Sequence, residues 1–414
     1  MNTLHVKYLL IGGGIASSAA AQEIRRRDRD GSALLVGQEI NRPYRRDALR
    51  GGYLRRQVGH NELFTLPANW FDENDVELQT AVRAVQVDVA RQSVSLSNGE
   101  EVAYDKLLIA TGATAKLLNV PGANLPGVLY LRTIEQADTL IHTIEKARQE
   151  GRKHGRGRGR AAIVGSGTDA TQLAQTLTEL GIEVELVLEN PQLWQGVAGD
   201  TTAKYVAREL ENNGVAVRGA SVGRIEGDGR VQRVVLSDSS AIQCDFVVGS
   251  IGLSPNKELL RATPVRAEKA ILTDEFCRTS AETIYAAGEC AAVLDPRFGK
   301  YRAIASSRAA EITGRIAGAN MAGGAERFDD LGGFTTRVFS LDVTAWGEPR
   351  MVDRRLVRSG ENRFAEIGVD VLGLIAQVIS IGPVEAGLEE LVRQRIAIDR
   401  REESLKDPRS PLDI

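Results

Sequence analysis

Hydrophobic and polar positions alternate along the chain in blocks that predict strands followed by helices. An apolar run, Lys7–Ile11, ends at three consecutive glycines, and the stretch that follows is rich in alanine and closes on arginines at positions 25–27. A second apolar run, Ala33–Val36, comes next. Strand, glycine turn, helix and strand in this order are typical of a βαβ unit, which builds a parallel sheet.

The same order returns in the middle of the chain. The apolar run Ala161–Val164 leads into Gly165-Ser166-Gly167, a helix-compatible stretch follows, and a further strand is predicted at Val184–Leu188, ending at Glu189. Both blocks have the layout of a dinucleotide-binding fold. We therefore expect an α/β protein with two Rossmann-like dinucleotide-binding domains.

The remaining segments of the chain predict connections and a third domain. Leu107–Gly112 is an apolar strand that closes on a small-residue turn, and the proline- and glycine-containing stretch 120–127 is typical of a crossover between domains. Lys153–Arg160 alternates glycine with arginine, so we expect an exposed loop there. Further on, Phe334–Val343 and Leu372–Ile381 are strand-like runs, which predict an α+β domain at the C-terminus.

Composition narrows the class of protein. A length of 414 residues favours two to four domains, and 43% hydrophobic with 26% charged residues is typical of a soluble globular chain. The longest N-terminal apolar stretch, Tyr8–Ile11, is far shorter than the roughly 20 residues that cross a bilayer. We therefore expect a cytoplasmic protein without a membrane partner. The net charge of −3 gives no overall attraction to nucleic acid.

Cysteines and histidines carry no recognisable catalytic or metal-binding pattern. The three cysteines form neither a CxxC pair nor a metal-ligand cluster, so we expect free buried thiols and no metal site. The four histidines lie outside every glycine motif, and we assign none of them a catalytic role. These residues are Cys244, Cys277, Cys290, His5, His60, His142 and His154.

The first glycine turn fits the GxGxxG pattern of dinucleotide-binding folds. It reads Gly12-Gly13-Gly14-Ile15-Ala16-Ser17, with a small serine in place of the last glycine. Glycine is needed because a side chain would keep a pyrophosphate away from the backbone N–H groups at the helix N-terminus, where the helix dipole favours anions. Glu39, after the next strand, is placed to accept hydrogen bonds from a ribose diol; the alternative is a solvated loop acid.

The second glycine turn carries its own acidic residue. Gly165-Ser166-Gly167-Thr168-Asp169-Ala170 again ends on a small residue, and Glu189 follows 22 residues after Gly167. A carboxylate at that place binds the adenosine 2′-hydroxyl and repels a 2′-phosphate. The second turn therefore favours NADH over NADPH.

A third element supports the first site. Ala286-Ala287-Gly288-Glu289 follows an apolar pair and would bring a backbone N–H and a carboxylate to a second sugar-phosphate element. By itself it could be a strand-to-helix turn in any α/β protein. Its order after Ala110-Thr111-Gly112 and both glycine turns makes a flavin site the better interpretation.

Taken together, these motifs resemble the FAD-dependent pyridine nucleotide-disulfide oxidoreductase superfamily, in particular its ferredoxin, rubredoxin and putidaredoxin reductase type. The resemblance extends over nearly the whole chain. Besides the two glycine turns, it is carried by six segments: Pro43–Arg46, Tyr104–Ala113, Leu125–Val128, Tyr130–Thr133, Gly252–Asn256 and Tyr285–Glu289.

The resemblance implies a glutathione-reductase-like architecture with two cofactors. FAD would be held by a discontinuous domain of residues 1–115 and 246–325, NADH by residues 116–245, and residues 326–414 would form the C-terminal domain. Hydride would pass from the nicotinamide to the flavin without a catalytic side chain, because the cofactors supply the chemistry. The implied cofactor-binding residues are Gly12, Gly14, Ile15, Ala16, Glu39, Arg46, Val82, Ala110, Thr111, Gly112, Gly165, Gly167, Thr168, Asp169, Glu189, Gly252, Gly288 and Glu289.

Three positions depart from the family pattern. Glu289 replaces the usual aspartate, Gly51 stands where a flavin-contacting lysine is usual, with Arg50 beside it, and Gln172 replaces a glutamate near the nicotinamide. Each departure could slow hydride transfer or change the flavin potential. No cysteine pair accompanies the flavin segment, so reduced flavin would pass electrons directly to an external acceptor.

Three hypotheses for the acceptor follow. The first is a small iron–sulfur carrier of the ferredoxin or rubredoxin kind, the second is oxygen, a quinone or another small molecule, and the third is an NADH-sensing flavoprotein with slow turnover. The arginine-glycine loop, with arginines near position 355, could attract an acidic carrier, although solvated charge is the simpler interpretation. The sequence leaves open whether the protein is a monomer or a homodimer.

Overall fold

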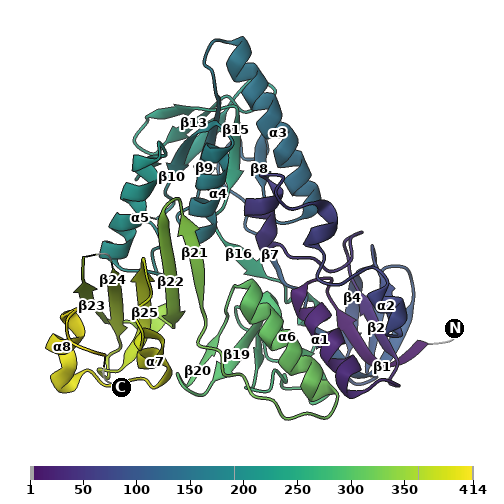
Figure 1. The fold of residues 1–414 in the computed structure, drawn as a ribbon. Coiled ribbons are helices and arrows are strands. Elements are labelled where there is room, and N and C mark those ends of the chain that lie inside the picture. Colours follow the sequence, from purple (N-terminus) through teal and green to yellow (C-terminus); the bar gives the residue numbers. More distant parts are fainter. Residues whose placement is uncertain (1–3, 191, 362, 413–414) are drawn as a thin grey trace. The chain divides into compact units, whose positions relative to one another are not determined.

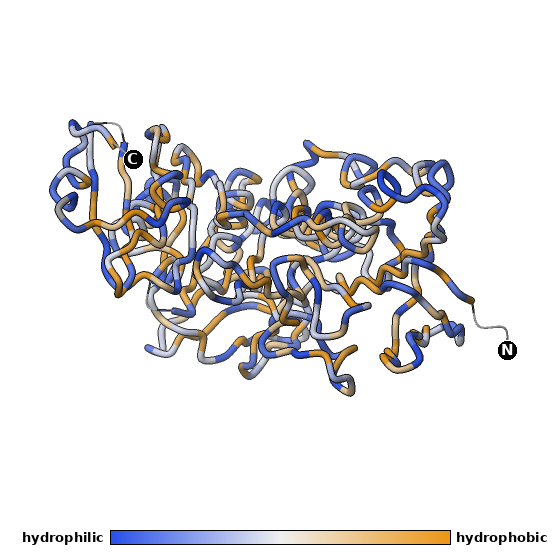
Figure 2. The backbone as a smooth tube through the Cα atoms, turned by 90° about the horizontal axis from the view of Figure 1, so that it is seen from below, coloured by the Kyte–Doolittle hydropathy of each residue, from blue (hydrophilic) through white to orange (hydrophobic). Residues whose placement is uncertain are grey.

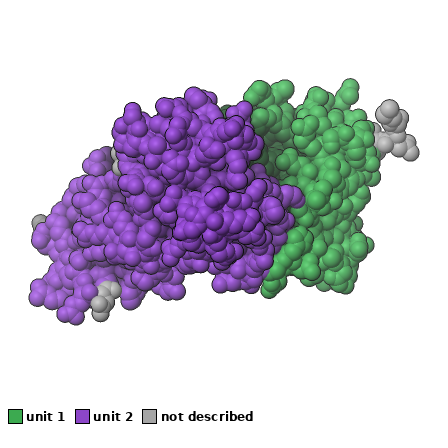
Figure 3. Space-filling view, turned by 90° about the horizontal axis from the view of Figure 1, so that it is seen from above, with its two compact units in different colours: residues 1–47, 59–114, 254–330 green, residues 48–58, 115–253, 331–414 purple. Residues whose placement is uncertain are grey.

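The computed structural model describes residues 4–190, 192–361 and 363–412, and it divides the chain into two compact units (Figure 3). The first unit contains residues 1–47, 59–114 and 254–330. The second contains residues 48–58, 115–253 and 331–414. The predicted split into three domains stays a prediction, since residues 331–414 are grouped here with 115–253.

The first unit is built on a largely parallel sheet with strand order β3-β2-β1-β6-β5-β4, and β18 pairs with β6. The strands β1, β2, β3, β6 and β18 run parallel to one another, whereas β4 and β5 form an antiparallel extension. Their bounds are β1 Leu4–Ile11, β2 Ala33–Val36, β3 Val76–Gln79, β4 Ala84–Asp88, β5 Ser93–Leu96, β6 Glu101–Ile109 and β18 Ile284–Ala286. A smaller sheet joins β17 Ile271–Thr273, β19 Ala291–Asp295 and β20 Lys300–Arg302, and a short helix, α2, spans Trp70–Glu73.

Two long helices of this unit, α1 (Ile15–Arg27) and α6 (Ser307–Met321), lie side by side (Figure 1). Glycine permits the close approach: a Cβ on Gly314 would lie 2.2 Å from the carbonyl oxygen of Ala16, and one on Gly318 would lie 2.4 Å from that of Ala20. Figure 2 colours the apolar stretches of the backbone orange, and many apolar residues of the strands and of these two helices are buried.

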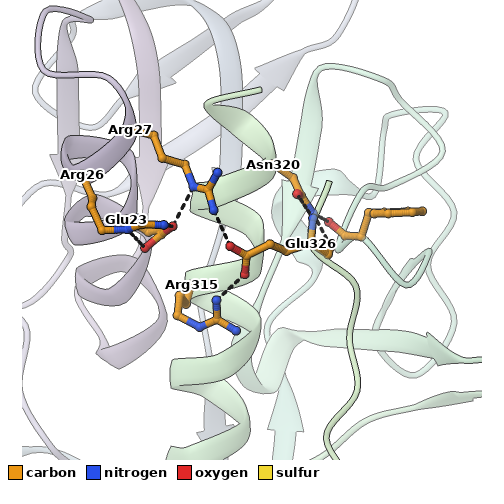
Figure 4. Close-up of polar contacts among 7 residues, drawn as sticks. Glu23, Arg26, Arg27, Arg315, Asn320 and Glu326 are labelled. Carbon is orange, nitrogen blue, oxygen red and sulfur yellow. Dashed lines mark hydrogen bonds and ion pairs between the residues drawn. The ribbon is translucent and has the colours of Figure 1, made fainter. Parts of the chain in front are cut away.

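Ion pairs through Glu326 also link the same helices. Glu23 of α1 accepts from Arg26 and Arg27, and Arg27 also pairs with Glu326, which binds Arg315 of α6 (Figure 4). The arginines of these pairs are partly exposed, so each pair adds at most about 1 kcal/mol. They align two helices whose contact is set by small residues.

The second unit contains the other parallel sheet, with strand order β11-β10-β9-β15-β8. The strands are β8 Val128–Tyr130, β9 Gly159–Val164, β10 Ile182–Val187, β11 Ala216–Arg218 and β15 Phe246–Gly249. Its helices are α3 Ile134–Lys153, α4 Thr168–Glu179 and α5 Asp200–Asn212. An antiparallel sheet of β12 Val222–Glu226, β13 Arg233–Leu236 and β14 Ala241–Gln243 adjoins it, and the short strands β7 Ala113–Ala115 and β16 Leu253–Pro255 contain the points where the chain changes unit.

Residues 331–414 add an antiparallel sheet of order β21-β22-β25-β24-β23. The bounds are β21 Gly333–Val338, β22 Leu341–Gly347, β23 Arg354–Ser359, β24 Phe364–Val369 and β25 Ile375–Ile381, followed by α7 Leu388–Arg393 and α8 Glu402–Lys406. The buried Glu366 of β24 accepts from the Thr202 hydroxyl (2.6 Å) and from the backbone N–H of Gly199 (3.1 Å) at the start of α5. This sheet therefore caps a helix of the adjoining dinucleotide fold.

Most predicted strands are found, with local corrections. Ala33–Val36 has the predicted bounds, whereas the run Phe334–Val343 is divided between β21 and β22 because the chain turns at Phe339, whose φ is +52°. The expected loop Lys153–Arg160 is shorter than predicted, since Lys153 ends α3 and Gly159 begins β9. Among the described helices, none is long and apolar enough to cross a membrane. The α/β class with two Rossmann-like folds and an antiparallel C-terminal sheet is confirmed.

Candidate cofactor sites

The first candidate site lies where the strand order of the first sheet reverses, at the carboxyl ends of β1 and β6. Ile11 is in register with Val36 of β2 and with Ile109 of β6, and Ile109 is also in register with Ala286 of β18. The residues after these strand ends therefore meet at one edge. Ligands of open parallel sheets bind in the crevice at such a switch point.

Gly12 makes the turn at this edge possible. Its φ is +128°, and its N–H donates to the carbonyl oxygen of Val36 (2.8 Å). A Cβ at this position would lie 2.1 Å from the carbonyl oxygen of Ala110. The turn therefore requires glycine for backbone packing, before any ligand is considered.

Gly14 has a different role at the N-terminus of α1. Its backbone is extended (φ −127°), and a Cβ there would meet no atom within 4 Å. Among the described residues no side chain caps this helix and its first turn holds no acid, so the N–H groups of its first turn remain available to an anion. Ile15 and Ala16 are buried behind this end, as is Ser17, the small residue in the last glycine position.

A cluster of polar side chains follows the second strand of the same unit. The guanidinium of Arg46 donates to one carboxylate oxygen of Glu39 (2.5 Å) and to the hydroxyl of Tyr44 (2.6 Å), which itself donates to the other Glu39 oxygen (2.6 Å). Burial disfavours the charged guanidinium, yet Tyr44 and Glu39, with a contribution from Glu289, hold the pKa of Arg46 above its ordinary value. The predicted residues Glu39, Arg46 and Glu289 thus form one electrostatic group.

Other predicted residues come to the same edge through backbone contacts. The N–H of Val82 donates to the carbonyl oxygen of Gly37, one residue beyond β2 (3.0 Å). Gly288 has a φ of +74°, and its N–H donates to the Thr313 hydroxyl (3.0 Å). A Cβ on Gly288 would lie 3.2 Å from the Cβ of Ala16, so the late glycine element lies against the start of α1.

Asn256 holds the third segment, Ala110-Thr111-Gly112. Its side-chain amide donates to the carbonyl oxygen of Thr111 (2.9 Å) and its own N–H donates to that of Gly112 (2.9 Å). The Thr111 hydroxyl donates back to the Asn256 carbonyl oxygen (2.7 Å). The sequence indicates Asn256 only as part of a motif. It does not predict this role, because Asn256 and the segment Ala110–Gly112 lie far apart in the chain.

The second candidate site repeats the first arrangement at the ends of β9 and β10. Gly165 has a φ of +157°, and a Cβ there would lie 2.2 Å from the carbonyl oxygen of Ser250, just beyond β15. Gly167 precedes α4 in an extended conformation, and a Cβ there would meet no atom within 4 Å. Thr168 and Asp169 form the open first turn of this helix.

Glu189 lies two residues beyond β10 and directly before Asn190, which contacts this turn. Its side chain is exposed and makes no hydrogen bond or ion pair with other described residues. The neighbouring Asn190 donates from its amide to the hydroxyl of Ser166 (2.9 Å). The Glu189 carboxylate is therefore free to accept hydrogen bonds from a ligand bound at the Gly165–Gly167 turn.

The segment 48–58 contributes Arg50 to the second site. This arginine lies in a π-helical turn, Leu49–Tyr53, a form that is frequent at functional sites. Its guanidinium pairs with the Asp169 carboxylate (3.0 Å) and donates to the side-chain oxygen of Gln172 (3.2 Å). Arg50 thus binds two of the predicted polar positions of α4, Asp169 and Gln172, whereas Gly51 has no side chain to do so.

Gly252 belongs to the second unit, in the segment that follows β15. It is exposed, with a φ of +98°, and its carbonyl oxygen accepts from the N–H of Lys116 (3.0 Å). It lies two residues before the chain returns to the first unit. Its predicted role in cofactor binding stays a prediction.

Comparison with known proteins identifies the family. Residues 6–319 match the family model described as pyridine nucleotide-disulphide oxidoreductase, which is well over half of the chain. The chain belongs to this family. Members of the family are oxidoreductases that use FAD and NAD(H).

Individual relatives and solved structures agree with this assignment. The chain is 29% identical over 373 residues to the rhodocoxin reductase of Rhodococcus erythropolis, covering 88% of this chain and 85% of the relative. It is 30% identical over 284 residues to the ferredoxin–NAD(+) reductase component of the biphenyl dioxygenase system of Paraburkholderia xenovorans (68% and 67% covered). The structure of the ferredoxin reductase for the CYP199A2 system from Rhodopseudomonas palustris aligns with a TM-score of 0.83, 27% identity and 91% of each chain.

The geometry of both sites fits these cofactors. In each, a glycine that cannot carry a side chain turns the backbone, and a second glycine leaves the N-terminus of a helix open to a pyrophosphate. The first site would hold FAD between Gly14, the Glu39–Arg46 group and Gly288. The second would hold NAD(H) between Gly167 and Glu189. Among the described residues no group of three or more potential ligands could hold a metal ion.

The three cysteines are free and buried, as expected. Burial raises the pKa of Cys244 to about 12 and raises the pKa of Cys277 and of Cys290. Cys290 donates its thiol to the carbonyl oxygens of Ile109 (3.4 Å) and Ala287 (3.3 Å), so it lies beside the first site as a packed, protonated group.

These shifts predict inert thiols in the native protein. A raised pKa keeps the unreactive protonated form, so at pH 8 the Cys244 thiolate is about one part in ten thousand. We expect no reaction of the folded protein with Ellman's reagent between pH 7 and 9, and three reactive thiols after unfolding in guanidinium. Rapid labelling of one thiol in the folded protein would contradict this assignment.

Proposed function

We propose that this protein is an NADH-dependent flavoprotein reductase that passes electrons through FAD to a small iron–sulfur carrier of the ferredoxin or rubredoxin kind. The observation that carries the proposal is the pair of glycine turns, each at a sheet switch point and each followed by an open helix N-terminus. The relatives named above are reductases of such carriers, which supports the choice of acceptor.

The flavin, when bound, supplies the conversion between a two-electron hydride donor and one-electron carriers. The chain supplies binding and orientation. The N-termini of α1 and α4 would attract the two pyrophosphates, Glu39 and Glu189 would accept from ribose hydroxyls, and the partly buried Arg46 would set the charge beside the first cofactor. Since the described cysteines are buried and protonated, a thiol relay has no support in the structure.

The decisive experiment is anaerobic reduction of the purified yellow protein in a stopped-flow instrument. We expect NADH to bleach the flavin absorbance and a ferredoxin or rubredoxin to restore it, with two carrier molecules reduced per NADH because each accepts one electron. NADPH should act far more slowly. A flavin that NADH leaves unreduced would refute the mechanism.

A second measurement tests the acceptor. Turnover in air without a carrier should be slow and should rise steeply when the carrier is added. Steady NADH consumption that carriers do not change would instead support an oxidase or small-molecule reductase. A tight NADH complex with very slow turnover would support a sensing role, in which the Gly51, Gln172 and Glu289 departures lower the rate.

A further inference from the structure

Trp194 is the largest fully buried side chain of the described chain, and it lies just beyond the Glu189 segment. It stands between β10 and α5, and its backbone φ is +56°. Large side chains rarely adopt such a conformation, which costs on the order of 1–3 kcal/mol and persists where the surroundings impose it. The contacts around Trp194 therefore hold its backbone in a conformation that it would not adopt by itself.

Its contacts join three parts of the second unit. The Trp194 N–H donates to the carbonyl oxygen of Ser166, the middle residue of the second glycine turn (2.7 Å). The indole N–H donates to the hydroxyl of Thr171 (3.4 Å), which donates to the Thr168 carbonyl oxygen in the first turn of α4 (2.9 Å). The indole ring also packs edge-on against Phe334 of β21, with centroids 5.6 Å apart and an interplanar angle of 89°.

Ser166 is thereby bound twice by the segment that carries Glu189. Asn190 donates to the Ser166 hydroxyl, and Trp194 donates to the Ser166 carbonyl oxygen. The exposed Glu189 lies directly before the first of these contacts. The position of Glu189 relative to the glycine turn therefore depends on both contacts, and the buried indole holds the backbone N–H that makes the second one.

We propose that Trp194 is a positioning residue that sets the Glu189 carboxylate at the distance from the Gly165–Gly167 turn at which it binds the adenosine ribose of NADH and repels a 2′-phosphate. The inference rests on the proposed function and adds to it the residue that determines cofactor choice. It also gives the contact between Trp194 and Phe334 a role, because β21 supports the indole from outside the dinucleotide fold.

Unreactive fragments separate binding from turnover. Calorimetry of the FAD-loaded protein with ADP-ribose and with 2′-phospho-ADP-ribose gives two dissociation constants, and their ratio measures discrimination. We expect the ratio to fall about tenfold in Trp194→Ala. A displaced Glu189 carboxylate would lose about one hydrogen bond to the ribose, and a bond to a charged group is worth about this much. Trp194→Phe keeps the ring and should retain most of the ratio. With NADH, the KM of Trp194→Ala should rise while kcat changes little.

A double-mutant cycle tests whether Trp194 acts through Glu189. Glu189→Gln alone should also reduce the ratio, and Trp194→Ala added to it should reduce the ratio no further. Additive losses would overturn the proposal. So would a Trp194→Ala protein that keeps the wild-type ratio.

Two controls keep the test decisive. If Trp194→Ala does not fold, by circular dichroism and flavin content, Phe334→Ala replaces it, because it removes the ring that packs edge-on against the indole; an unchanged ratio there would then count against the proposal. If wild-type protein binds neither fragment and NADH leaves its flavin oxidised, the proposed function fails. If wild type discriminates and the variants discriminate equally, only the role of Trp194 fails.

Discussion

Gly12→Ala is expected to give a protein that retains less than about one tenth of the wild-type FAD, a loss of at least about 1.4 kcal/mol in binding. The new Cβ would lie 2.1 Å from the carbonyl oxygen of Ala110 and 2.5 Å from its carbonyl carbon, and both are backbone atoms at the end of β6. The residue is also held by its hydrogen bond to Val36 at a φ of +128°. Strain at such a φ adds on the order of 1–3 kcal/mol.

The measurement is flavin content by absorbance, together with the thermal unfolding midpoint. Gly14→Ala is the matched control for the backbone, because its φ is ordinary and its Cβ would meet nothing within 4 Å. It should unfold at the wild-type temperature in the flavin-free form and bind FAD more weakly, since the methyl group faces the ligand. Gly99→Ala, at a φ of +88° in an open turn, should leave flavin content unchanged.

These three variants separate two roles of glycine. If Gly12→Ala keeps both full flavin content and wild-type stability, the turn is not constrained as the structure shows. If Gly14→Ala binds FAD as wild type does, the pyrophosphate does not approach the N-terminus of α1.

Arg46→Ala is expected to produce the second large effect, a loss of about 2 kcal/mol in stability, between the ~0–1 of exposed pairs and the ~3–5 of fully buried ones. The change removes the guanidinium that binds both Glu39 and Tyr44, and with it the positive charge that interacts with the carboxylates of Glu39 and Glu289. FAD affinity should fall as well, because two carboxylates without the cation repel the anionic cofactor.

Urea unfolding and flavin titration measure the two effects. Arg46→Lys keeps the charge but cannot reach both partners with a planar fork, so it should recover only part of the loss. Arg26→Ala is the matched control: its ion pair with Glu23 (2.6 Å) involves a side chain that is 64% exposed, and its removal should cost less than about 1 kcal/mol. Equal losses in Arg46→Ala and Arg26→Ala would contradict a partly buried charge cluster at the first site.

The sequence by itself determined the local parts of this protein. Strand Ala33–Val36 and the turns at Gly12 and Gly165 were predicted correctly because adjacent residues encode them: an apolar run forms the strand, and only glycine tolerates the φ that follows. The order of these motifs also predicted the fold and the family.

Only the tertiary structure decided which distant residues meet. Side chains join Thr111 with Asn256, Arg50 with Asp169 and Gln172, and Trp194 with Phe334, and the residues next to them in the sequence do not predict these partners. Strand register and helix placement bring these pairs together across 100 residues or more in several cases. A local pattern determines how the backbone turns, whereas a contact between separate segments depends on the packing of the whole unit. The polar surroundings of both sites are made of such contacts between separate segments, so the tertiary structure decides them.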